Sequence, residues 1–530
     1  MSTLTGTRHL VRLILRRDRV LLPLWVLILA VLPMSYAASF FALFPTAAER
    51  AAYAAGTARN PSIVALLGPV YGESVGALTA QRGGFLLVII ALASLLTVIR
   101  HTRTEEEAGR RELLGGTVLG RYAGLTAALL VTYAADLLLG LLTAAGLVAT
   151  GLPAAGSLAY GLAGALVGVV FATVGGLAAQ LTETAGGARG IAIAVLGVAF
   201  ALRIAGDAAE REWLSWLSPL GWAPRVRAYE GDRWWVLALP LVLSALLAAV
   251  AYPLSVRRDL GAGLMPPRLG PATAGRALAG PFGLAWRLHR GQILWWSVGF
   301  GLLGLILGGA AKAAGSSVEG NPQLEQIMTR IGGAAGLAEA YLGATLSLAG
   351  LAAAGYGIQA ALRMRSEETD GRAEPLLATG VSRARWLLSH ALIALVGPAV
   401  VLAVTGFATG LTYGISVHDV PGELPRMVGA GLAQLPAAWV LAGLAVLLYG
   451  LLPRFAPAAW AVLAVCVLLG QLGAVLELSQ WLLDLSPFTH TPQVLGDHWH
   501  ATPLWLLSVV ALLMAAVGLT AFRRRDTPVT

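Results

Sequence analysis

Long apolar runs without a single charge recur along the whole chain of 530 residues, and this feature limits what the chain can fold into. A run of 18 or more such residues can cross about 30 Å of hydrocarbon as a helix. Charged residues make up 12% of the chain, about half the fraction usual in soluble proteins, and hydrophobic residues make up 57%. The pattern excludes a soluble enzyme and a disordered or collagen-like chain, and it predicts an all-α polytopic membrane protein.

Twelve segments are apolar enough to span a membrane, and the fifth of them is the shortest. With both termini on the inner side, 26 of the 37 Lys and Arg residues fall in inner loops, as the positive-inside rule requires. We therefore expect twelve spans with cytoplasmic N and C termini. The expected spans are residues 20–44, 84–99, 122–148, 158–180, 190–202, 234–255, 293–311, 341–362, 386–415, 428–452, 456–476 and 504–522.

The basic residues and the cysteine content narrow the function classes further. The net charge of +9 is spread over loops between apolar runs, so the lipid bilayer accounts for it and no nucleic-acid partner is expected. Cys466 is the only cysteine, so the chain has no intrachain disulfide and no thiolate metal site.

Two charged loops repeat each other, one after the second expected span and one after the eighth. Residues 103–121 read RTEEEAGRRELLGGTVLGR and residues 365–383 read RSEETDGRAEPLLATGVSR. Hydrophobic composition cannot produce these matches, which indicate an internal duplication. At an offset of 262, Arg103, Glu105, Glu106, Gly109, Arg110, Glu112, Leu114, Thr117 and Arg121 match Arg365, Glu367, Glu368, Gly371, Arg372, Glu374, Leu376, Thr379 and Arg383.

A second repeated segment precedes the last span of each half. Both halves also end alike, since Arg257, Arg258 and Asp259 match Arg524, Arg525 and Asp526. We expect a first six-span half at 1–260, a cytoplasmic linker at 261–281 and a parallel second half at 282–530. In the second segment Trp213, Leu217, Ser218, Pro219, Pro224 and Val226 match Trp481, Leu485, Ser486, Pro487, Pro492 and Val494.

Charge spacing predicts two kinds of short helix outside the spans. In residues 8–19 four arginines recur at helical spacing, which predicts an amphipathic helix on the inner leaflet, with residues 284–290 as its counterpart. In the charged loops, Glu106 with Arg110 and Glu368 with Arg372 stand at i,i+4, which predicts a small cytoplasmic helix in each loop. A charged helix presented twice suits docking onto a two-fold symmetric partner.

The order of these motifs resembles a transporter family. The pattern R-x-E-E-x-x-G-R-x-E lies between the second and third spans of a six-span unit. It follows an amphipathic helix and precedes S-P-x-x-x-x-P before the sixth span. In this the chain is similar to the ABC-2 type permeases over essentially its whole length. The duplicated, arginine-rich form resembles exporter permeases of high-GC Gram-positive bacteria for polyketide antibiotics and drugs, the tetronasin type.

The resemblance implies an ATP-driven exporter in the bacterial cytoplasmic membrane that moves hydrophobic or amphipathic compounds out of the cell. Residues 103–114 and 365–376 would be coupling helices seated in two copies of a separate ATPase subunit. The substrate path would lie between the halves. Outer hairpins capping the exit would hold Ser218, Pro219, Pro224, Ser486, Pro487 and Pro492.

The chain has no ATPase motif of its own. A P-loop needs G-x-x-x-x-G-K-[ST], and Lys312, the only lysine, stands in GGAAKAAGSS. We therefore expect a transport subunit that is not an enzyme and holds no cofactor, with ATP and Mg²⁺ bound by the partner.

A few polar residues within spans keep other readings open. Asp136 is the clearest acid inside a span and either binds a cationic substrate or proton or makes a packing hydrogen bond; Gln359 is a weaker candidate for the substrate path. The first alternative is a proton-coupled drug carrier of the major facilitator type, which would depend on Asp136. A membrane-embedded lipid or glycan enzyme would depend on Asp497, His498 and His500.

Overall fold

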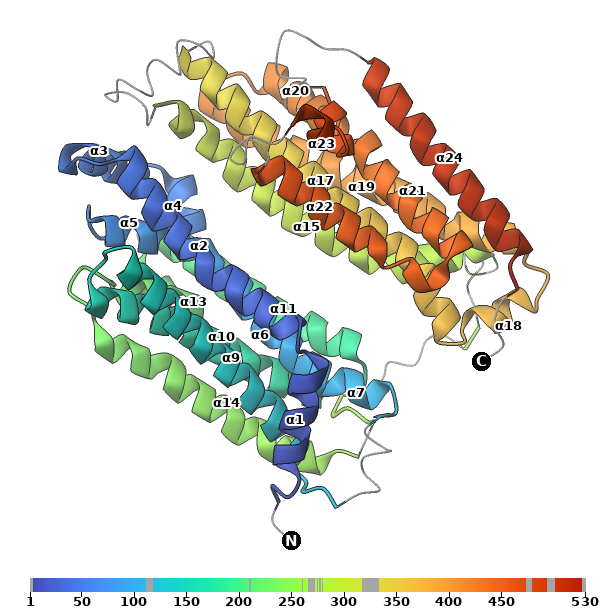
Figure 1. The fold of residues 1–530 in the computed structure, drawn as a ribbon, viewed down its shortest axis with the longest axis horizontal. Coiled ribbons are helices and arrows are strands. Elements are labelled where there is room, and N and C mark those ends of the chain that lie inside the picture. The colour runs from blue at the N-terminus through green and yellow to red at the C-terminus, as the bar shows by residue number, and fades with distance from the viewer. Residues whose placement is uncertain are drawn as a thin grey trace. The chain divides into compact units, whose positions relative to one another are not determined.

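In a computed structural model of the protein, all regular structure of the described residues is helical (Figure 1). Eleven helical segments of the described residues are long and apolar enough to cross a membrane. The chain is therefore an all-α polytopic membrane protein. The structure describes residues 3–110, 118–208, 211–259, 261–265, 272–273, 275, 278, 280–316, 333–472, 479–492 and 501–526.

The chain divides into two compact units, Met1–Gly270 (unit 1) and Pro271–Thr530 (unit 2). Unit 1 contains α1 (Thr7–Arg17), α2 (Leu21–Leu43), α3 (Ala47–Ala58), α4 (Pro61–Leu67), α5 (Val75–Arg82), η1 (Gly83–Phe85), α6 (Leu86–His101), α7 (Arg103–Glu107), α9 (Ala123–Ala149), α10 (Ala154–Leu181), α11 (Ala185–Ala208), α12 (Glu212–Trp216), α13 (Pro219–Arg225), η2 (Trp234–Leu237) and α14 (Ala238–Arg257). Unit 2 contains α15 (Pro281–Ser316), α17 (Gly333–Thr369), α18 (Ala373–Leu377), α19 (Arg383–Val417), α20 (Val420–Leu432), α21 (Leu435–Leu451), η4 (Pro453–Phe455), α22 (Ala458–Leu472), α23 (Gln480–Leu483), η5 (Pro487–His490) and α24 (Thr502–Arg524).

The same helix pairs pack together within each unit. In unit 1 the central helix α10 contacts α6, α9 and α14, and in unit 2 the corresponding helix α21 contacts α17, α19 and α24. Small residues allow these close approaches, as is usual between membrane helices. A Cβ on Gly161 would stand 2.2 Å from the carbonyl oxygen of Gly140, so α9 and α10 touch through their backbones.

Eleven of the twelve expected spans correspond to these apolar segments. The fifth is longer than expected, because α11 has 24 residues. The eleventh corresponds to α22, whose 15 residues are shorter than a full crossing, and residues 473–478 lie outside the described part of the chain. The exact count of twelve therefore stays a prediction.

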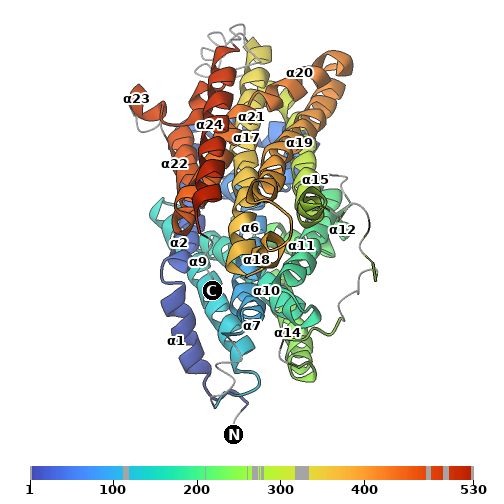
Figure 2. The same cartoon turned by 90° about the vertical axis from the view of Figure 1, so that its right-hand side faces the viewer.

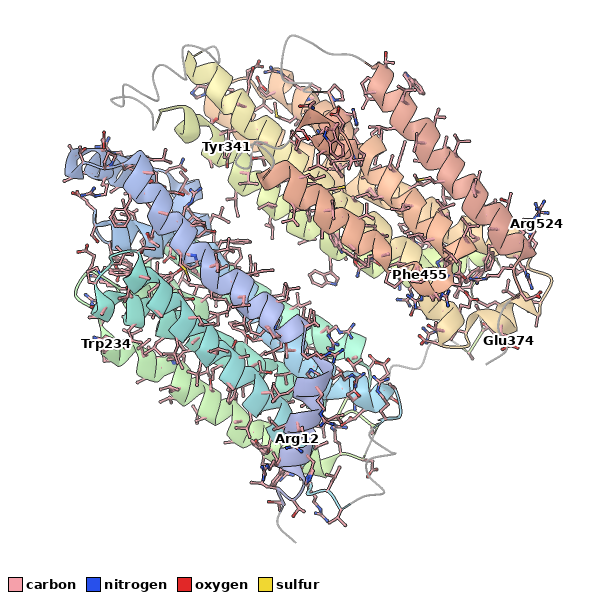
Figure 3. The ribbon with its side chains drawn as sticks, in the orientation of Figure 1. Arg12, Trp234, Tyr341, Glu374, Phe455 and Arg524 are labelled. Atoms are coloured by element: carbon pink, nitrogen blue, oxygen red, sulfur yellow. The ribbon has the colours of Figure 1, made fainter. Side chains whose placement is uncertain are left out.

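The two amphipathic segments differ in structure. α1 is a separate helix before α2 (Figure 2), as predicted, and packs Leu10, Val11 and Ile14 against the core of unit 1. Its expected counterpart at 284–290 is not separate, because it continues into the 36-residue helix α15. Arg12 on α1 and Trp234 lie at opposite ends of unit 1 (Figure 3).

Candidate functional site: the two charged loops

The charged loop of unit 1 begins where α6 ends. Thr102 interrupts the helix with φ −114° and ψ −83°, and α7 then runs for five residues, Arg103–Glu107. Gly109 ends the segment at φ +68°, a conformation that costs glycine little. No atom of the described residues lies within 4 Å of a Cβ built on Gly109, so the positive φ of the turn accounts for the glycine. Glu112 lies outside the described residues.

The first glutamate of each motif closes this turn. Arg110 donates to Glu105 from Nε and Nη2 at 2.8 and 2.9 Å, and Arg17 of α1 donates to the same carboxylate at 2.5 Å. In unit 2, Gly371 has φ +69° and Arg372 donates to Glu367 at 2.8 and 3.3 Å. The two loops therefore share one charge-assisted turn.

The second glutamate of the motif is buried in unit 1. Glu106 accepts from Arg103 at 2.5 Å and from Nη2 of Arg258, which follows α14, at 2.9 Å, and it forms an ion pair with Nη1 of Arg258 at 2.8 Å. The side chain of Arg103 has no exposed surface and also donates to the carbonyl oxygens of Thr182 and Ala262. The loop is thus fastened to the end of the last helix of the unit.

Unit 2 repeats this fastening with matching residues. Arg525, which follows α24, donates to both carboxylate oxygens of Glu368 at 2.6 and 2.7 Å. It also donates to the carbonyl oxygen of Tyr449, and its own carbonyl oxygen accepts from Arg383 at 2.5 Å. We call Glu106–Arg258 and Glu368–Arg525 the arginine clamps.

The structure corrects the predicted ion pairs within the loops. Glu106 with Arg110 and Glu368 with Arg372 were expected to pair at i,i+4, but each arginine binds the preceding glutamate instead. The reason is that the glycine turn folds the arginine back, while the second glutamate faces the clamp arginine. The i,i+4 prediction is therefore wrong.

The predicted loop helix of unit 1 can be followed only in part, because residues 111–117 lie outside the described part of the chain. In unit 1 the described helix is limited to residues 103–107, and in unit 2 Arg365 lies half-buried in the last turns of α17, which ends at Thr369 before α18. The charged side chains that stay exposed within residues 103–110 and 365–377 of the loops are those of Glu107, Arg110, Asp370, Arg372 and Glu374. Figure 3 places Glu374 at the end of unit 2 that also carries Arg524.

The repeated Ser-Pro segments form similar turns. Ser218 caps α13 by accepting from the amide of Leu220, and its hydroxyl donates to the carbonyl oxygen of Ala199 at 2.6 Å. Pro219 occupies the first helical position, where no amide hydrogen is needed, and Pro224 lies in the same helix. α13 packs on η2, which holds Trp234 at the end of unit 1 away from α1.

The corresponding turn of unit 2 is tighter. Ser486 accepts from the amide of Phe488 and caps η5, a 3₁₀ turn that begins at Pro487. Pro492 follows without regular structure, and Val494 lies outside the described residues. Both units therefore begin this segment with a serine cap followed by proline. In unit 1 an α-helix follows, and in unit 2 a 3₁₀ turn follows. Asp497, His498 and His500 also lie outside the described residues.

The two polar candidates of the spans occupy different environments. Asp136 is fully buried where α9 meets α6 and α10: it accepts from the Ser94 hydroxyl at 2.7 Å, and a Cβ on Gly168 would stand 2.4 Å from its Oδ1. Gln359 of α17 is exposed on the surface of unit 2. Oδ1 of Asp136 thus makes a helix-packing hydrogen bond, while its Oδ2 is buried without a partner among the described residues.

Replacing Asp136 with asparagine should therefore leave the protein intact. Asparagine has nearly the same volume and keeps the oxygen that Ser94 contacts, so we expect a stability change within about 1 kcal/mol and unchanged transport. Thermal unfolding in detergent and cellular drug accumulation measure these two quantities. A loss of transport with normal folding would instead assign Asp136 to a proton or cation pathway.

Arg258 and Arg525 are the site residues that motif reasoning did not assign. They belong to the matched ends of the two halves, so the repeat contained the signal. Their partners are 152 and 157 residues away in sequence, and only the fold brings them together.

Two compact helical units, each with a charged loop bound to the end of its last helix, define an all-α multi-pass membrane protein. Comparison with known proteins identifies the family to which this membrane protein belongs. Residues 278–523 match the family model described as multidrug efflux system permease Rv1217c, C-terminal domain. The chain is 49% identical over 527 residues to the multidrug efflux system permease protein Rv1217c of Mycobacterium tuberculosis H37Rv, covering 99% of this chain and 96% of that protein. The chain belongs to this permease family.

Proposed function

We propose that the chain is the membrane subunit of an ATP-driven exporter of the ABC-2 class, which moves hydrophobic or amphipathic compounds out of the cell. Two copies of a separate ATPase subunit would bind ATP and Mg²⁺. The observation that carries the proposal is the full-length likeness to a multidrug efflux permease, together with a charged loop presented twice. The sequence itself contains no P-loop lysine motif, which is why we assign the ATPase to a partner.

The clamps support a role for the loops in coupling. Glu106 is buried and Glu368 is largely so, hence neither is free to meet a partner, whereas Arg110, Arg372 and Glu374 are exposed beside them. In this proposal the exposed side chains contact the ATPase. The clamps then carry the movement of each loop to the last helix of its unit. Cytoplasmic loops, with both termini inside, are part of the same proposal.

The first experiment is affinity purification of the tagged protein from its native membrane, with mass spectrometry and an ATPase assay. We expect a P-loop subunit at two copies per permease. Purification of the permease alone, with drug export that stops when the proton gradient is removed, would favour the carrier of the major facilitator type.

Charge reversal of Arg110 and Arg372 tests docking, and the midpoint of thermal unfolding is measured with it because the same side chains also bind Glu105 and Glu367 in the loop turns. In the double variant Arg110→Glu, Arg372→Glu we expect at least a tenfold drop in copurified ATPase, because two like-charged repulsions replace two attractions at the interface. The matched control is Arg211→Glu, a charge reversal at an exposed residue just before α12. It should leave the amount of copurified ATPase unchanged. Undiminished copurification in the double variant would exclude these side chains as the docking surface.

The alternative carrier has less support in the structure. It needs an ionisable group that exchanges protons with water, and Asp136 has no exposed surface in the described residues of unit 1. We therefore keep the ATP-driven exporter as the proposed function.

A further inference from the structure

The apolar face of α1 is covered by the rest of unit 1. Ile14 is buried in a cluster with residues of α6, α9 and α14, and Leu10 and Val11 pack against the same cluster. An amphipathic helix on a membrane normally turns its apolar face to the lipid. In α1 this face is occupied by protein, so contact with the membrane has to be made by another side of the helix.

The side of α1 opposite this apolar face carries a row of arginines. Arg8, Arg12 and Arg16 follow one another at intervals of four residues, which places them on one side of the helix. All three are exposed, as is Arg19 in the turn that joins α1 to α2. We call these four side chains the arginine row. Leu13 and Leu15 are exposed on either side of it, so cationic and apolar groups lie together on this surface.

No acid of the described residues pairs with the arginine row. Asp18 is the first acid in the sequence, and the next is Glu49. Asp18 is buried and already paired with Arg100 and His101. The row therefore presents four positive charges that the described part of unit 1 does not neutralise. Other arginines at this end of the unit do bind a carboxylate, namely Arg17, Arg100, Arg103, Arg110 and Arg258.

The helix ends beside α1 add further positive charge. Arg121 is exposed just before α9, and Arg257 is exposed at the last residue of α14. The two ends lie side by side, because the rings of Tyr122 and Tyr252 are in contact with their centres 5.2 Å apart. Asp259 is the exposed acid that follows α14, and it leaves the two arginines in excess.

The position of α1 along the chain places it directly outside the hydrocarbon layer. α2 begins at Leu21, and its 23 residues form a helix about 34 Å long, which is enough to cross about 30 Å of hydrocarbon. The amides of Gly120 and Tyr122 donate to the carbonyl oxygens of Thr5 and Thr3, so α1 starts beside the start of α9. α9 has 27 residues, about 40 Å, and extends beyond the hydrocarbon. The arginine row therefore lies at the level of the lipid headgroups.

From this arrangement we infer that the arginine row binds the headgroups of anionic phospholipids in the adjoining leaflet. A guanidinium group donates two parallel hydrogen bonds to a phosphate, and Leu13 and Leu15 contact the upper part of the acyl chains. A zwitterionic lipid carries a compensating ammonium group, so an anionic lipid is preferred. The inference goes beyond the proposed function, because lipid binding needs neither ATP nor an ATPase subunit.

Quenching of a fluorophore beside the arginine row tests this lipid selectivity. In the full-length protein, Cys466→Ala removes the only cysteine and Leu15→Cys supplies the labelling site. The protein is reconstituted into phosphatidylcholine vesicles with nitroxide-labelled phosphatidylglycerol or nitroxide-labelled phosphatidylcholine at the same mole fraction. We expect the quenching to show about fivefold enrichment of phosphatidylglycerol around the label. High salt should reduce the enrichment, because it screens the charges.

Variants of the arginine row show whether it causes the enrichment. The quadruple variant Arg8→Gln, Arg12→Gln, Arg16→Gln, Arg19→Gln should remove the enrichment, and replacement of the same four residues by lysine should keep most of it. The glutamine variant should keep its midpoint of thermal unfolding, since the row has no acid partner among the described residues. The matched control is Arg523→Gln with Arg524→Gln, two exposed arginines at the end of α24, and it should leave the quenching at residue 15 unchanged.

Three results would overturn the inference. Equal quenching by the two lipids would show that the row does not select anionic lipid. Enrichment that persists in the glutamine variant would assign the lipid to other residues. Quenching by neither lipid would show that the row faces water, as expected if it binds an acidic protein surface instead.

Discussion

Glu106→Lys is expected to destabilise unit 1 by about 3–5 kcal/mol, the cost of breaking a buried ion pair. The change places a third positive charge beside Arg103 and Arg258, neither of which can move to water without loosening the loop. The midpoint of thermal unfolding in detergent should fall sharply and the yield of folded protein should drop.

The control for this experiment is Glu374→Lys, the same change at an exposed position of the other charged loop. It should leave the unfolding midpoint unaltered. If Glu106→Lys folded normally and lost only ATPase binding, the clamp would be a contact surface and not a structural tie.

The clamp of unit 2 permits a sharper test. Glu368 and Arg525 bind each other through two short hydrogen bonds, so Glu368→Arg and Arg525→Glu should each destabilise the protein. The double exchange should restore part of the loss, which a double-mutant cycle measures as a coupling energy of about 1–3 kcal/mol. Additive losses would show that the two side chains do not interact.

The second large effect is expected from Gly450→Leu. A Cβ on Gly450 would stand 2.1 Å from the carbonyl oxygen of Gly518, and one on Gly518 would stand 2.6 Å from that of Val446. Backbone atoms cannot avoid the added side chain by changing rotamer, so α21 and α24 would have to separate. We expect a loss of about 3 kcal/mol or more.

Thermal unfolding measures this loss, with Gly429→Leu as the control. Gly429 is exposed on α20, and nothing in the described structure lies within 4 Å of a Cβ built there. The control should be close to neutral. A small effect in Gly450→Leu would mean that α24 is not held by this backbone contact.

The sequence predicts the positions of most long helices and only part of the structure of the loops. The length of the apolar runs alone predicts α2, α9, α10 and α24. In a membrane such a run must form a helix, because only a helix gives all its backbone N–H and C=O groups hydrogen-bond partners within the same segment. It did not predict that residues 284–290 continue into α15, because basic residues flank a span in the same pattern whether or not the helix is broken before it.

The repeat identified the right loop residues but not their contacts. Gly109 and Gly371 were recognised as matched positions, yet only their positive φ shows why the next arginine binds the first glutamate and not the second. The clamp could not be predicted from local spacing, because Glu106 and Arg258 are 152 residues apart in the sequence. The sequence likewise does not show that Glu106 is buried and Glu374 is exposed, because burial depends on how the helices pack.

α24 packs against α21 along its length and is also bound to the charged loop at its C-terminal end. Few of its residues are buried, namely Ala511, Gly518 and Phe522, and the clamp arginine follows immediately after its last turn. A helix of 23 residues is about 34 Å long, so a rotation of about 10° at Arg525 displaces the far end by about 6 Å. Because α24 touches α21 through Gly518 and Ala511, such a rotation would carry α21 with it, and a tilt at the charged loop would move the two helices as a pair.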